Sequence, residues 1–270
     1  MKRIESAANP QFRNLLGLAA SARDRRKLGL SVIEGAHLLD AYLTRHGRPV
    51  ELFVPEHPSA EVSALVARAG VAPTVLAGRL FAQASQVENG PGPIAIVHTP
   101  RPELPMRFDS DAVYLDRVQD PGNVGSVLRT CAAVGVRCVI ASHGTAFCWS
   151  PKVLRAAMGA HFHLDIHEGI EPEELLGRLA VEAMATTADA PADLYATDLR
   201  APRVWLLGNE GQGLDGALLT ARGVRRVSIP QSDAVESLNV GVAAAVCLYE
   251  QLRQRRAAES GQSSPRDRRA

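Results

Sequence analysis

Three segments in the C-terminal half of the chain each combine a short apolar run with a small, polar loop. Their sequences are DRVQDPGNVGSVLRTCAAVG at residues 116–135, LLGNEGQGL at residues 206–214 and SIPQSDAVESLNVGVAAAVCLY at residues 228–249. The first two join an apolar strand to a loop with glycines, and the third places a turn-forming loop before an apolar helix. If the three strands belong to one sheet, these loops form a single crevice at its edge, where open α/β sheets bind ligands. The pattern therefore predicts one binding site built from all three segments.

Short β-like runs alternate with helical patterns through most of the chain. The N-terminal part has β-like runs at residues 52–54 and 94–97 and helical patterns at residues 36–44 and 60–69. The strand candidates of the C-terminal part are residues 113–115, 138–141, 163–166, 183–187, 204–207 and 227–229. Helical segments separate most of these strands, which favours a mainly parallel sheet with helices on both faces. We therefore expect an α/β fold.

The chain divides into two parts at residues 99–111, which read TPRPELPMRFDSD. The three prolines and several charges in this stretch oppose any regular element. We expect a small α/β domain at residues 1–98, a linker at residues 99–111 and a second α/β domain at residues 112–254. The sequence after Arg253 lacks apolar periodicity, so residues 255–270 are predicted to form a basic, flexible tail.

The positive charge of the chain is concentrated at its two ends. The formal net charge is +1, but residues 1–30 hold seven Lys and Arg against two acids, and residues 253–270 hold six against two. The residues between these ends therefore carry a net charge of about −8. Basic ends are compatible with contacts to a phosphate backbone, and equally with simple solvation of the termini.

Composition and motifs exclude several classes of protein. With 270 residues, 46% of them hydrophobic, the chain can bury one large or two modest cores. The four cysteines form no Cys-x-x-Cys pair, so a zinc ribbon or a thioredoxin-type motif is disfavoured, and reduced, buried thiols are expected. The apolar run at residues 240–249 is shorter than the roughly 18 residues of a membrane span, and the N-terminus lacks a signal-peptide pattern. We therefore expect a cytoplasmic protein with no membrane contact.

Neither a metal site nor a nucleotide-phosphate loop is indicated. His161, His163 and His167 lie close in sequence, and a strand would place the first two on one face, but no Cys or Asp ligand joins them. The loop GNEGQG lacks the Gly-x-Gly-x-x-Gly spacing, and no Gly-Lys-Ser/Thr follows it. The sequence therefore disfavours bound metal, nicotinamide and ATP.

The three segments carry three sequence motifs. The first has the form Asn-x-Gly with an Arg six residues after the Asn, and comprises Asn123, Gly125 and Arg129 after Asp120 and Pro121. The second, Gly-x-Glu-Gly-x-Gly, comprises Gly208, Glu210, Gly211 and Gly213, and the third comprises Ile229, Pro230 and the Ser-Leu-Asn-Val of residues 237–240. In this order and spacing the motifs resemble those of the SpoU (TrmH-like) family of RNA ribose 2′-O-methyltransferases, in the SPOUT class.

The resemblance covers residues 112–252 strongly and residues 25–98 more loosely. It implies an N-terminal RNA-substrate-binding domain of L30e-like (ribosomal-protein-L30-like) α/β form, and a C-terminal SPOUT domain with a trefoil knot. It also implies a homodimer that takes a methyl group from S-adenosyl-L-methionine and transfers it to a ribose 2′-hydroxyl of rRNA or tRNA.

The donor-binding positions lie in the second and third motifs. The resemblance assigns Gly208, Ile229 and Leu238 to the methyl donor. The residue types suit this role, because glycines such as Gly208 and Gly213 let the backbone approach a ligand, and Ile229 and Leu238 offer apolar walls to an adenine. The alternative is that the glycines only end a strand and the two apolar residues belong to an ordinary core.

Methyl transfer to a ribose hydroxyl requires a group that polarises this poor nucleophile. The resemblance assigns Arg129 to this task, although a guanidinium is normally too strongly protonated to act as a base. Glu210 is expected to fix its loop or to pair with Arg129. Asn123 is expected just before a helix that begins near Gly125, where it orients Arg129 or the substrate, or caps the helix. The alternatives are a surface ion pair for Arg129 and a solvated loop carboxylate for Glu210.

Ser237 and Asn239 lie at the entrance to the last helix. They are placed to contact donor or target, and helix capping is the competing role for both. This segment departs from the family pattern at three positions, where Gln231 replaces the usual Met, Asp233 the usual Gly and Gly241 the common Ser or Ala. All polar residues of the motifs are present, so we expect an active enzyme.

Basic residues near the N-terminus are the predicted RNA contacts. Arg23, Arg25, Arg26 and Lys27 precede VIEGAHLL, which resembles the start of the SpoU substrate-binding domain. Phosphate binding by such a cluster is salt-sensitive and not sequence-specific. Aromatic residues make up only 4% of the chain, so recognition of folded RNA shape is favoured over extensive base stacking.

Two other functions are compatible with parts of this pattern. A non-catalytic RNA-binding or ribosome-assembly protein with the same fold would bind RNA without transferring a methyl group. An enzyme that methylates a base or a small molecule is the second alternative, and the Asn-x-Gly motif with Arg129 argues against it. The combination of motifs favours a ribose methyltransferase over both.

Overall fold

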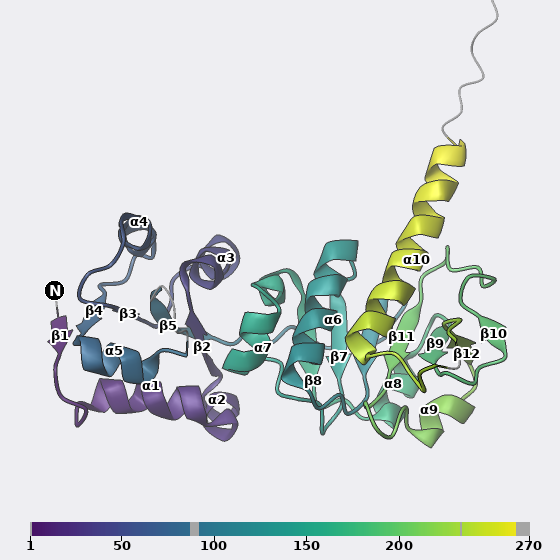
Figure 1. The fold of residues 1–270 in the computed structure, drawn as a ribbon, viewed down its shortest axis with the longest axis horizontal. Coiled ribbons are helices and arrows are strands. Elements are labelled where there is room, and N and C mark those ends of the chain that lie inside the picture. The colour runs from purple at the N-terminus through teal and green to yellow at the C-terminus, as the bar shows by residue number, and fades with distance from the viewer. Residues whose placement is uncertain (1, 87–91, 233, 263–270) are drawn as a thin grey trace, which may run out of the picture. The chain divides into compact units, whose positions relative to one another are not determined.

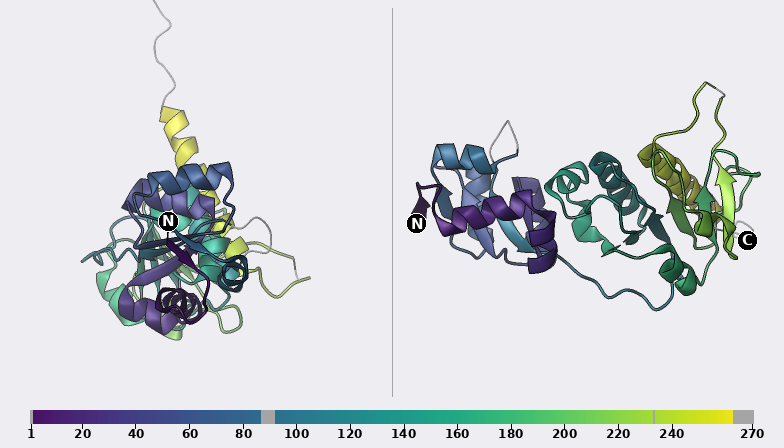
Figure 2. Two further views of the ribbon diagram at one scale, coloured as in Figure 1. Left: turned by 90° about the vertical axis from the view of Figure 1, so that its left-hand side faces the viewer. Right: turned by 90° about the horizontal axis from the view of Figure 1, so that it is seen from below.

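The computed structural model describes residues 2–86, 92–232 and 234–262 of the chain. The backbone forms two compact units, the first from residues 1–101 and 147–163 and the second from residues 102–146 and 164–270. Both units combine helices with a β-sheet (Figures 1 and 2). The predicted α/β class is therefore confirmed.

The first unit is built on a five-stranded mixed sheet with the strand order β1-β4-β3-β5-β2. Its strands are β1 (Lys2–Ile4), β2 (Leu30–Glu34), β3 (Glu51–Val54), β4 (Thr74–Leu76) and β5 (Ile94–His98). Its helices are α1 (Pro10–Ala20), α2 (Ala22–Leu28), α3 (Ala36–His46), α4 (Ala60–Arg68), α5 (Gly78–Ala84), α7 (Pro151–Ala156) and the 3-10 helix η1 (Ala160–His163). β5 runs antiparallel to β2 and β3, and the other neighbours are parallel.

Helices lie on both faces of this sheet (Figure 1). α1 and α5 cover one face, where Leu15 and Phe81 join a buried cluster with Ile96. α1 begins where it does because Asn9 accepts hydrogen bonds from two N–H groups of the first turn and Pro10 follows it. α3 and α4 lie on the other face and pack against each other. The small N-terminal α/β unit thus has its own core.

Residues 147–163 pack with the first unit, whereas the sequence placed them in the second domain. The ring of Phe162 meets that of Tyr42 edge-on at 5.4 Å between centroids, and His161 packs against Trp149. Because two successive residues are buried in this way, residues 160–163 form η1 instead of the start of a strand. The predicted strand at residues 163–166 is therefore displaced, and the observed strand begins at Asp165.

The second unit is built on a seven-stranded sheet with the order β10-β12-β9-β11-β6-β7-β8, in which all neighbours are parallel. Its strands are β6 (Ala112–Leu115), β7 (Cys138–Ala141), β8 (Asp165–Glu168), β9 (Ala183–Thr186), β10 (Ala192–Asp193), β11 (Val204–Leu207) and β12 (Val224–Ser228). Its helices are α6 (Pro121–Val134), α8 (Pro172–Arg178), α9 (Gly216–Thr220) and α10 (Val240–Gln262).

The central strands of this sheet are apolar because helices cover both of their faces. Tyr114 and Leu206 share a buried cluster with Leu175 of α8 and Leu218 of α9. On the opposite face Nε1 of Trp205 donates a hydrogen bond to Gln251 of α10 at 2.7 Å. α6 packs against α10. The mainly parallel, doubly covered sheet that the alternation predicts is therefore present.

The last helix is longer than the sequence indicates. Residues 255–270 were predicted to form a flexible tail, but α10 continues to Gln262. Arg255 forms an ion pair with Asp111, and its Nη2 also donates to the carbonyl oxygen of Ala201 at 2.9 Å. Polar contacts with the preceding loops hold this part of the helix, so apolar periodicity was the wrong signal for it. Residues 263–270 of the predicted tail lie outside the described residues.

The stretch predicted as a linker, residues 99–111, has no helix or strand, apart from a single bridge between Phe108 and Leu179. All four cysteines are free thiols, and Cys131, Cys148 and Cys247 are buried. In the described ranges, none of the helices has the length and apolar character needed to cross a membrane.

Candidate functional site

The loops of the three motifs lie at the same edge of the seven-stranded sheet. β12, β9, β11 and β6 are neighbours in that order and run parallel, so their carboxyl ends share one edge. The loops that lead into or form the three motifs begin directly after β6, β11 and β12. The predicted convergence of three loops is therefore observed, with β9 as a fourth strand between two of them.

α6 places the first motif. Its N-cap is Asp120, whose Oδ1 accepts a hydrogen bond from the backbone N–H of Asn123 at 2.8 Å. Pro121 occupies the first helical position, where a missing N–H costs nothing. The helix therefore begins before Gly125, and Asn123 lies in its first turn instead of in the preceding loop as predicted. Since Asp120 is the cap, the side-chain amide of Asn123 is available for other contacts.

The carboxylate of Glu210 joins the second motif to the first. Its oxygens accept hydrogen bonds from the backbone N–H groups of Gln119 and Asp120, both at 3.2 Å, and from Nδ2 of Asn123 at 2.9 Å. Partial burial opposes ionisation, but these hydrogen bonds outweigh it and hold the pKa of Glu210 below its usual value. Within the described residues, Glu210 forms no ion pair with Arg129. Of the two predicted roles, fixing the backbone is the one that the structure shows.

Asn239 joins the third motif to the first. Its Nδ2 donates a hydrogen bond to Oδ1 of Asn123 at 2.8 Å. Its Oδ1 accepts from the N–H groups of Gly241 and Val242 at the start of α10, at 2.9 and 3.3 Å. Asn239 therefore caps α10 and links the loops with the same amide group, so both roles considered for it hold. Glu210, Asn123 and Asn239 form a hydrogen-bonded chain that we call the three-loop network.

The loop of the second motif is closed on itself. Asn209 and Gly213 exchange two backbone hydrogen bonds of 3.0 and 2.9 Å, and Oδ1 of Asn209 accepts from the N–H groups of Gly211 and Gln212. A Cβ on Gly208 would lie 2.4 Å from the carbonyl carbon of Gly213, so no larger residue fits there. Gly213 has a φ of 69°, a left-handed conformation that favours glycine. The compact shape of the loop therefore requires both glycines.

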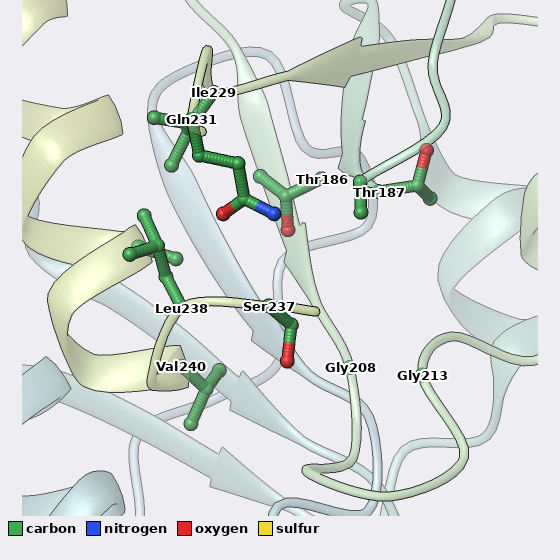
Figure 3. Close-up of a pocket in the computed structure, with 11 residues that line it drawn as sticks. Thr186, Thr187, Gly208, Gly213, Ile229, Gln231, Ser237, Leu238 and Val240 are labelled. Carbon is green, nitrogen blue, oxygen red and sulfur yellow. The ribbon is translucent and has the colours of Figure 1, made fainter. Parts of the chain in front are cut away.

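A pocket of about 580 Å³, counting the space that opens to solvent, lies beside this loop (Figure 3). Its lining residues are Thr186, Thr187, Ala188, Gly208, Gly213, Ile229, Gln231, Ser237, Leu238, Val240 and Ala243. All four predicted donor-binding residues line it, and so does Ser237. For Ser237 the structure therefore shows a place in the pocket wall, while among the described residues Asn239 is the one whose side chain caps α10.

The sequence motifs do not indicate the part of the pocket that β9 supplies. Thr186, Thr187 and Ala188 lie at the carboxyl end of this strand. No glycine or motif marks this end, and the position of β9 between β11 and β12 depends on a strand order that no local pattern encodes. The available signal was the predicted strand itself, since all ends of parallel strands at one edge are candidates for ligand contact. Val240 and Ala243 were missed because they were assigned to the core helix.

Two of the three departures from the family pattern lie in the described residues. Gln231 lines the pocket, and its Nε2 donates to the carbonyl oxygen of Glu236 at 3.1 Å. A Cβ on Gly241 would lie 3.3 Å from Cβ of Ser126, so this glycine lets α10 approach α6 closely. Asp233 lies outside the described residues.

Arg129 lies on α6, exposed to solvent. In the described part of the chain, its guanidinium forms no hydrogen bond or ion pair. The surface ion pair that the sequence left open for Arg129 is therefore not formed. Arg129 is not among the residues that line the pocket, and it lies one turn beyond Ser126, which faces Gly241.

The basic cluster near the N-terminus does not act as one group. Arg23, Arg26 and Lys27 of α2 are exposed, as RNA contacts require. Arg25 is only 4% exposed, and its Nη1 donates to the carbonyl oxygens of Leu18 and Ala19 at the end of α1. The prediction that Arg25 contacts RNA is therefore wrong, because this guanidinium satisfies the C-terminus of a helix.

The three histidines considered as metal ligands are dispersed. His161 is buried, with Nε2 at 2.7 Å from the carbonyl oxygen of Cys148, and His167 lies on β8 in the other unit. No group of three His, Cys, Asp or Glu side chains arranged for a metal ion occurs in residues 2–86, 92–232 and 234–262.

Comparisons with known proteins agree with these observations. Residues 111–249 match the model of the SpoU rRNA Methylase family. The chain is 31% identical to an uncharacterized tRNA/rRNA methyltransferase of Synechocystis over 95% of this chain and 96% of the relative. It is 30% identical to the 23S rRNA guanosine 2′-O-methyltransferase RlmP of Bacillus subtilis over 92% of this chain and 98% of the relative.

Solved structures show the same likeness. The SpoU methyltransferase AviRb of Streptomyces viridochromogenes, in complex with the cofactor AdoMet (S-adenosylmethionine), has a TM-score of 0.83 at 26% identity and covers 92% of this chain and 100% of its own. A structure described as an RNA 2′-O ribose methyltransferase has a TM-score of 0.79 at 30% identity, over 94% and 99% of the two chains. The chain therefore belongs to the SpoU rRNA methylase family and is an RNA ribose 2′-O-methyltransferase that uses S-adenosylmethionine.

Proposed function

We propose that this enzyme methylates ribosomal RNA, with the methyl donor in the pocket at the ends of β9, β11 and β12 and the target hydroxyl at Arg129. The observation that carries the proposal is the three-loop network, which ties the loops of all three motifs together beside that pocket. The choice of ribosomal RNA is supported by the relatives, because several of them are named as 23S rRNA 2′-O-methyltransferases.

The chemistry of the residues that line the pocket supports S-adenosylmethionine as its ligand. Gly208 has no room for a Cβ, and it leaves its backbone groups accessible at the pocket wall. Ile229 and Leu238 offer apolar surfaces to an adenine ring, and the hydroxyl groups of Thr186 and Ser237 add polar partners. When bound, the donor supplies a methyl group that is activated by a positively charged sulfur.

Arg129 is our candidate for the residue at the target hydroxyl. It lies six residues after Asn123, which is about 9 Å along the helix axis at 1.5 Å per residue. Side chains of a helix lean towards its N-terminus, so Arg129 is directed back towards Asn123 and the carboxyl edge of the sheet. A guanidinium is normally protonated. Arg129 therefore orients the 2′-hydroxyl and stabilises the negative charge that develops on its oxygen, while the proton leaves to an RNA phosphate oxygen or to water.

Glu210, Asn123 and Asn239 act as positioning residues for Arg129 in this scheme. Glu210 holds the two N–H groups that precede α6, and Asn123 holds the first turn of that helix against the cap of α10. α6 cannot shift relative to the pocket without breaking these hydrogen bonds. Alignment of a nucleophile with its target is worth several kcal/mol of a reaction barrier, so a fixed α6 matters for the rate.

The first unit is our candidate for the initial contact with RNA. Arg23, Arg26 and Lys27 lie within one short helix and are exposed, so they present positive charge to phosphates. Contacts of this kind position the substrate without reading its sequence. Because the proposed substrate is ribosomal RNA, we also propose that the enzyme works in the cytoplasm.

The proposal is tested by methyl transfer to RNA from cells that lack the gene. Purified protein is incubated with labelled S-adenosylmethionine and with separated rRNA and tRNA, both as naked RNA and as ribosomal particles. Nuclease digestion and nucleoside analysis then locate the label. We expect a single 2′-O-methylated nucleoside in rRNA.

The other outcomes separate the alternatives. Label on tRNA alone contradicts the choice of ribosomal RNA, and label on a base contradicts the choice of the 2′-hydroxyl. Binding of donor and of rRNA without any transfer, in both naked RNA and particles, supports the ribosome-assembly protein and contradicts the enzyme.

We also propose that the enzyme is a homodimer that uses the exposed face of α10. Val242 and Tyr249 are 50% and 51% exposed and lie seven residues apart, which places them on the same face two turns from each other. In a two-fold dimer, Val242 and Tyr249 of both protomers would be buried in the same interface. Sedimentation velocity over a concentration series tests this proposal. A Tyr249→Glu variant is expected to shift the protein to monomer, and a parent protein that is monomeric at all concentrations contradicts it.

A further inference from the structure

An ion pair between a buried aspartate and a partly exposed arginine lies next to the second-motif loop, at the carboxyl end of β6. The carboxylate of Asp116 is only 1% exposed. Its Oδ1 and Oδ2 accept hydrogen bonds from Nε and Nη2 of the adjacent Arg117, both at 3.0 Å. These hydrogen bonds raise the pKa of Arg117 above its usual value. A charge this deeply buried is retained only with a partner, so the two residues act as one unit.

The backbone of Arg117 is held in an unusual conformation. Its φ is 54°, in the left-handed region that a non-glycine residue rarely adopts. Three contacts determine it: the Arg117 N–H donates to Oγ of Ser142 at 2.9 Å, the Arg117 carbonyl accepts from Nδ2 of Asn209 at 2.8 Å, and the side chain is bound to Asp116. Such conformations persist where the surroundings over-determine them, which is common at functional sites.

The pair holds both ends of the loop that carries the second motif. At the start of the loop, the Arg117 carbonyl accepts a hydrogen bond from Nδ2 of Asn209. Oδ1 of the same Asn209 side chain accepts from the backbone N–H groups of Gly211 and Gln212 and so closes the turn. At the end of the loop, Oδ2 of Asp116 accepts from the N–H of Asp215 at 2.7 Å. Gly213, which lines the pocket, lies between these two points, and Gly208, which also lines it, directly precedes Asn209. Asp116 and Arg117 themselves do not line it.

We propose that Asp116 and Arg117 are a positioning pair for the methyl donor, which holds residues 208–215 in the donor-binding shape before the donor arrives. The inference rests on the proposed donor site in this pocket. A loop that is already ordered costs less entropy on binding, so its anchors contribute to affinity without touching the ligand. The pair therefore sets the affinity for S-adenosylmethionine and has no part in the transfer step.

The test uses variants that do not leave an unpaired buried charge. Arg117→Gly removes the side chain and accepts the left-handed backbone without strain. Asp116→Asn replaces the carboxylate by a neutral group of the same shape. The double variant D116N/R117G therefore removes the ion pair and leaves no buried ion. The matched control is Arg137→Gln. Arg137 pairs with Asp165 at 3.4 Å on the surface of the same unit, at the amino ends of β7 and β8 and therefore at the other edge of the sheet from the pocket.

The Kd for S-adenosylmethionine is measured by calorimetry. The KM for the donor and the kcat are measured by methyl transfer to rRNA, and all measurements are made below the melting temperature of each variant. For the double variant we expect the Kd and KM of the donor to rise about tenfold, while kcat at saturating donor and the Kd for RNA stay within about twofold. The Arg137→Gln control is expected to leave all four values unchanged.

Two results overturn the inference. One is a donor Kd within about twofold of the parent value in the folded double variant. The other is a parallel loss of kcat, donor affinity and RNA affinity, which indicates a role in folding alone. If the double variant does not fold, the two single variants are measured in the same way, and an unchanged donor Kd in either of them overturns it as well.

Gly208→Ala tests the donor site independently, because the added Cβ would lie 2.4 Å from backbone of the same loop. If this variant binds the donor as the parent does, the pocket is not the donor site and the proposed donor assignment fails with the inference. If Gly208→Ala loses binding and the double variant retains it, the positioning inference alone is overturned.

Discussion

Asn239 donates a hydrogen bond from Nδ2 to Oδ1 of Asn123 at 2.8 Å, across 116 positions of the chain. This contact brings the cap of α10 to the first turn of α6, so the two helices that carry the first and third motifs share a fixed point. Because Asn123 also donates to Glu210 of the second motif, a change at any one of the three residues affects all three loops.

Asn239→Asp separates the cap of α10 from the link to Asn123. Aspartate caps a helix as well as asparagine does, but it has no N–H to donate and faces the acceptor oxygen of Asn123. We expect this variant to melt near the parent temperature and to lose at least about tenfold in kcat. Asn239→Ala is the matched variant, since it also loses the cap and is expected to cost about 1 kcal/mol of stability. Thermal melts and methyl-transfer rates of both variants check the prediction, and a fully active Asn239→Asp contradicts it.

Glu210→Gln weakens the junction of the first and second motifs. An amide accepts at only one atom, whereas the carboxylate receives three hydrogen bonds. The pKa of Glu210 is lowered in the folded protein, so its contribution to stability is present above the ordinary pKa of a glutamate and is lost as the pH falls through the lowered value. We expect the variant to have a lower melting temperature than the parent at pH 7, and the difference between the two melting temperatures to disappear on acidification.

The control for this experiment is Glu103→Gln, because Glu103 is exposed and receives no hydrogen bond from any described residue. Thermal melts of the parent and both variants from pH 7 down to about pH 3 give the comparison. The assigned role is contradicted if the difference in melting temperature between the parent and Glu210→Gln stays constant over this range or widens at low pH.

Arg25 and Arg23 are expected to give opposite phenotypes, although both belong to α2. Arg25→Ala removes the donor that satisfies the carbonyl oxygens of Leu18 and Ala19, so it should lower the melting temperature. Arg23→Ala should leave the melting temperature unchanged, weaken RNA binding and reduce the slope of log K against log salt by about 1. Melting curves and RNA binding at several salt concentrations check this. Equal losses of RNA affinity in two equally stable variants would contradict the burial of Arg25.

Arg255→Ala tests the anchoring of the end of α10. Arg255 pairs with Asp111 and donates to the carbonyl oxygens of Arg200 and Ala201. We expect its loss to reduce the free energy of unfolding by roughly 2 kcal/mol, because several charge-assisted hydrogen bonds disappear together. Arg256→Ala is the matched control on the exposed side of the helix. Urea denaturation of both variants distinguishes an anchored helix from a solvated tail, for which the two variants would behave alike.

Local pattern predicts the elements of this fold well. The strands at residues 138–141 and 204–207 have the predicted bounds, because a short apolar run buried on both faces is read from its own composition. The four predicted donor-binding residues all line one pocket for a related reason, since glycines and apolar residues after a strand mark a site at the sheet edge. Their role in donor binding stays a prediction.

Long-range contacts limit what the sequence can predict. The place of β9 between β11 and β12 follows from strand order, and with it the contribution of Thr186 to the pocket. Arg25 has the same chemistry as its neighbours in sequence, and only the position of α1 makes it a buried donor. The trefoil knot and the L30e-like form of the first unit come from resemblance alone, and they stay predictions.

Comparison of donor binding with methyl transfer in Arg129→Ala tests the central claim most directly. Arg129 is exposed, lies outside the pocket and has no partner among the described residues, so its loss should disturb neither the fold nor the donor site. We predict a Kd for S-adenosylmethionine within about twofold of the parent and a rate of transfer to rRNA that is at least about 100-fold lower. A variant that transfers the methyl group at the parent rate would contradict the claim that the target hydroxyl lies at Arg129.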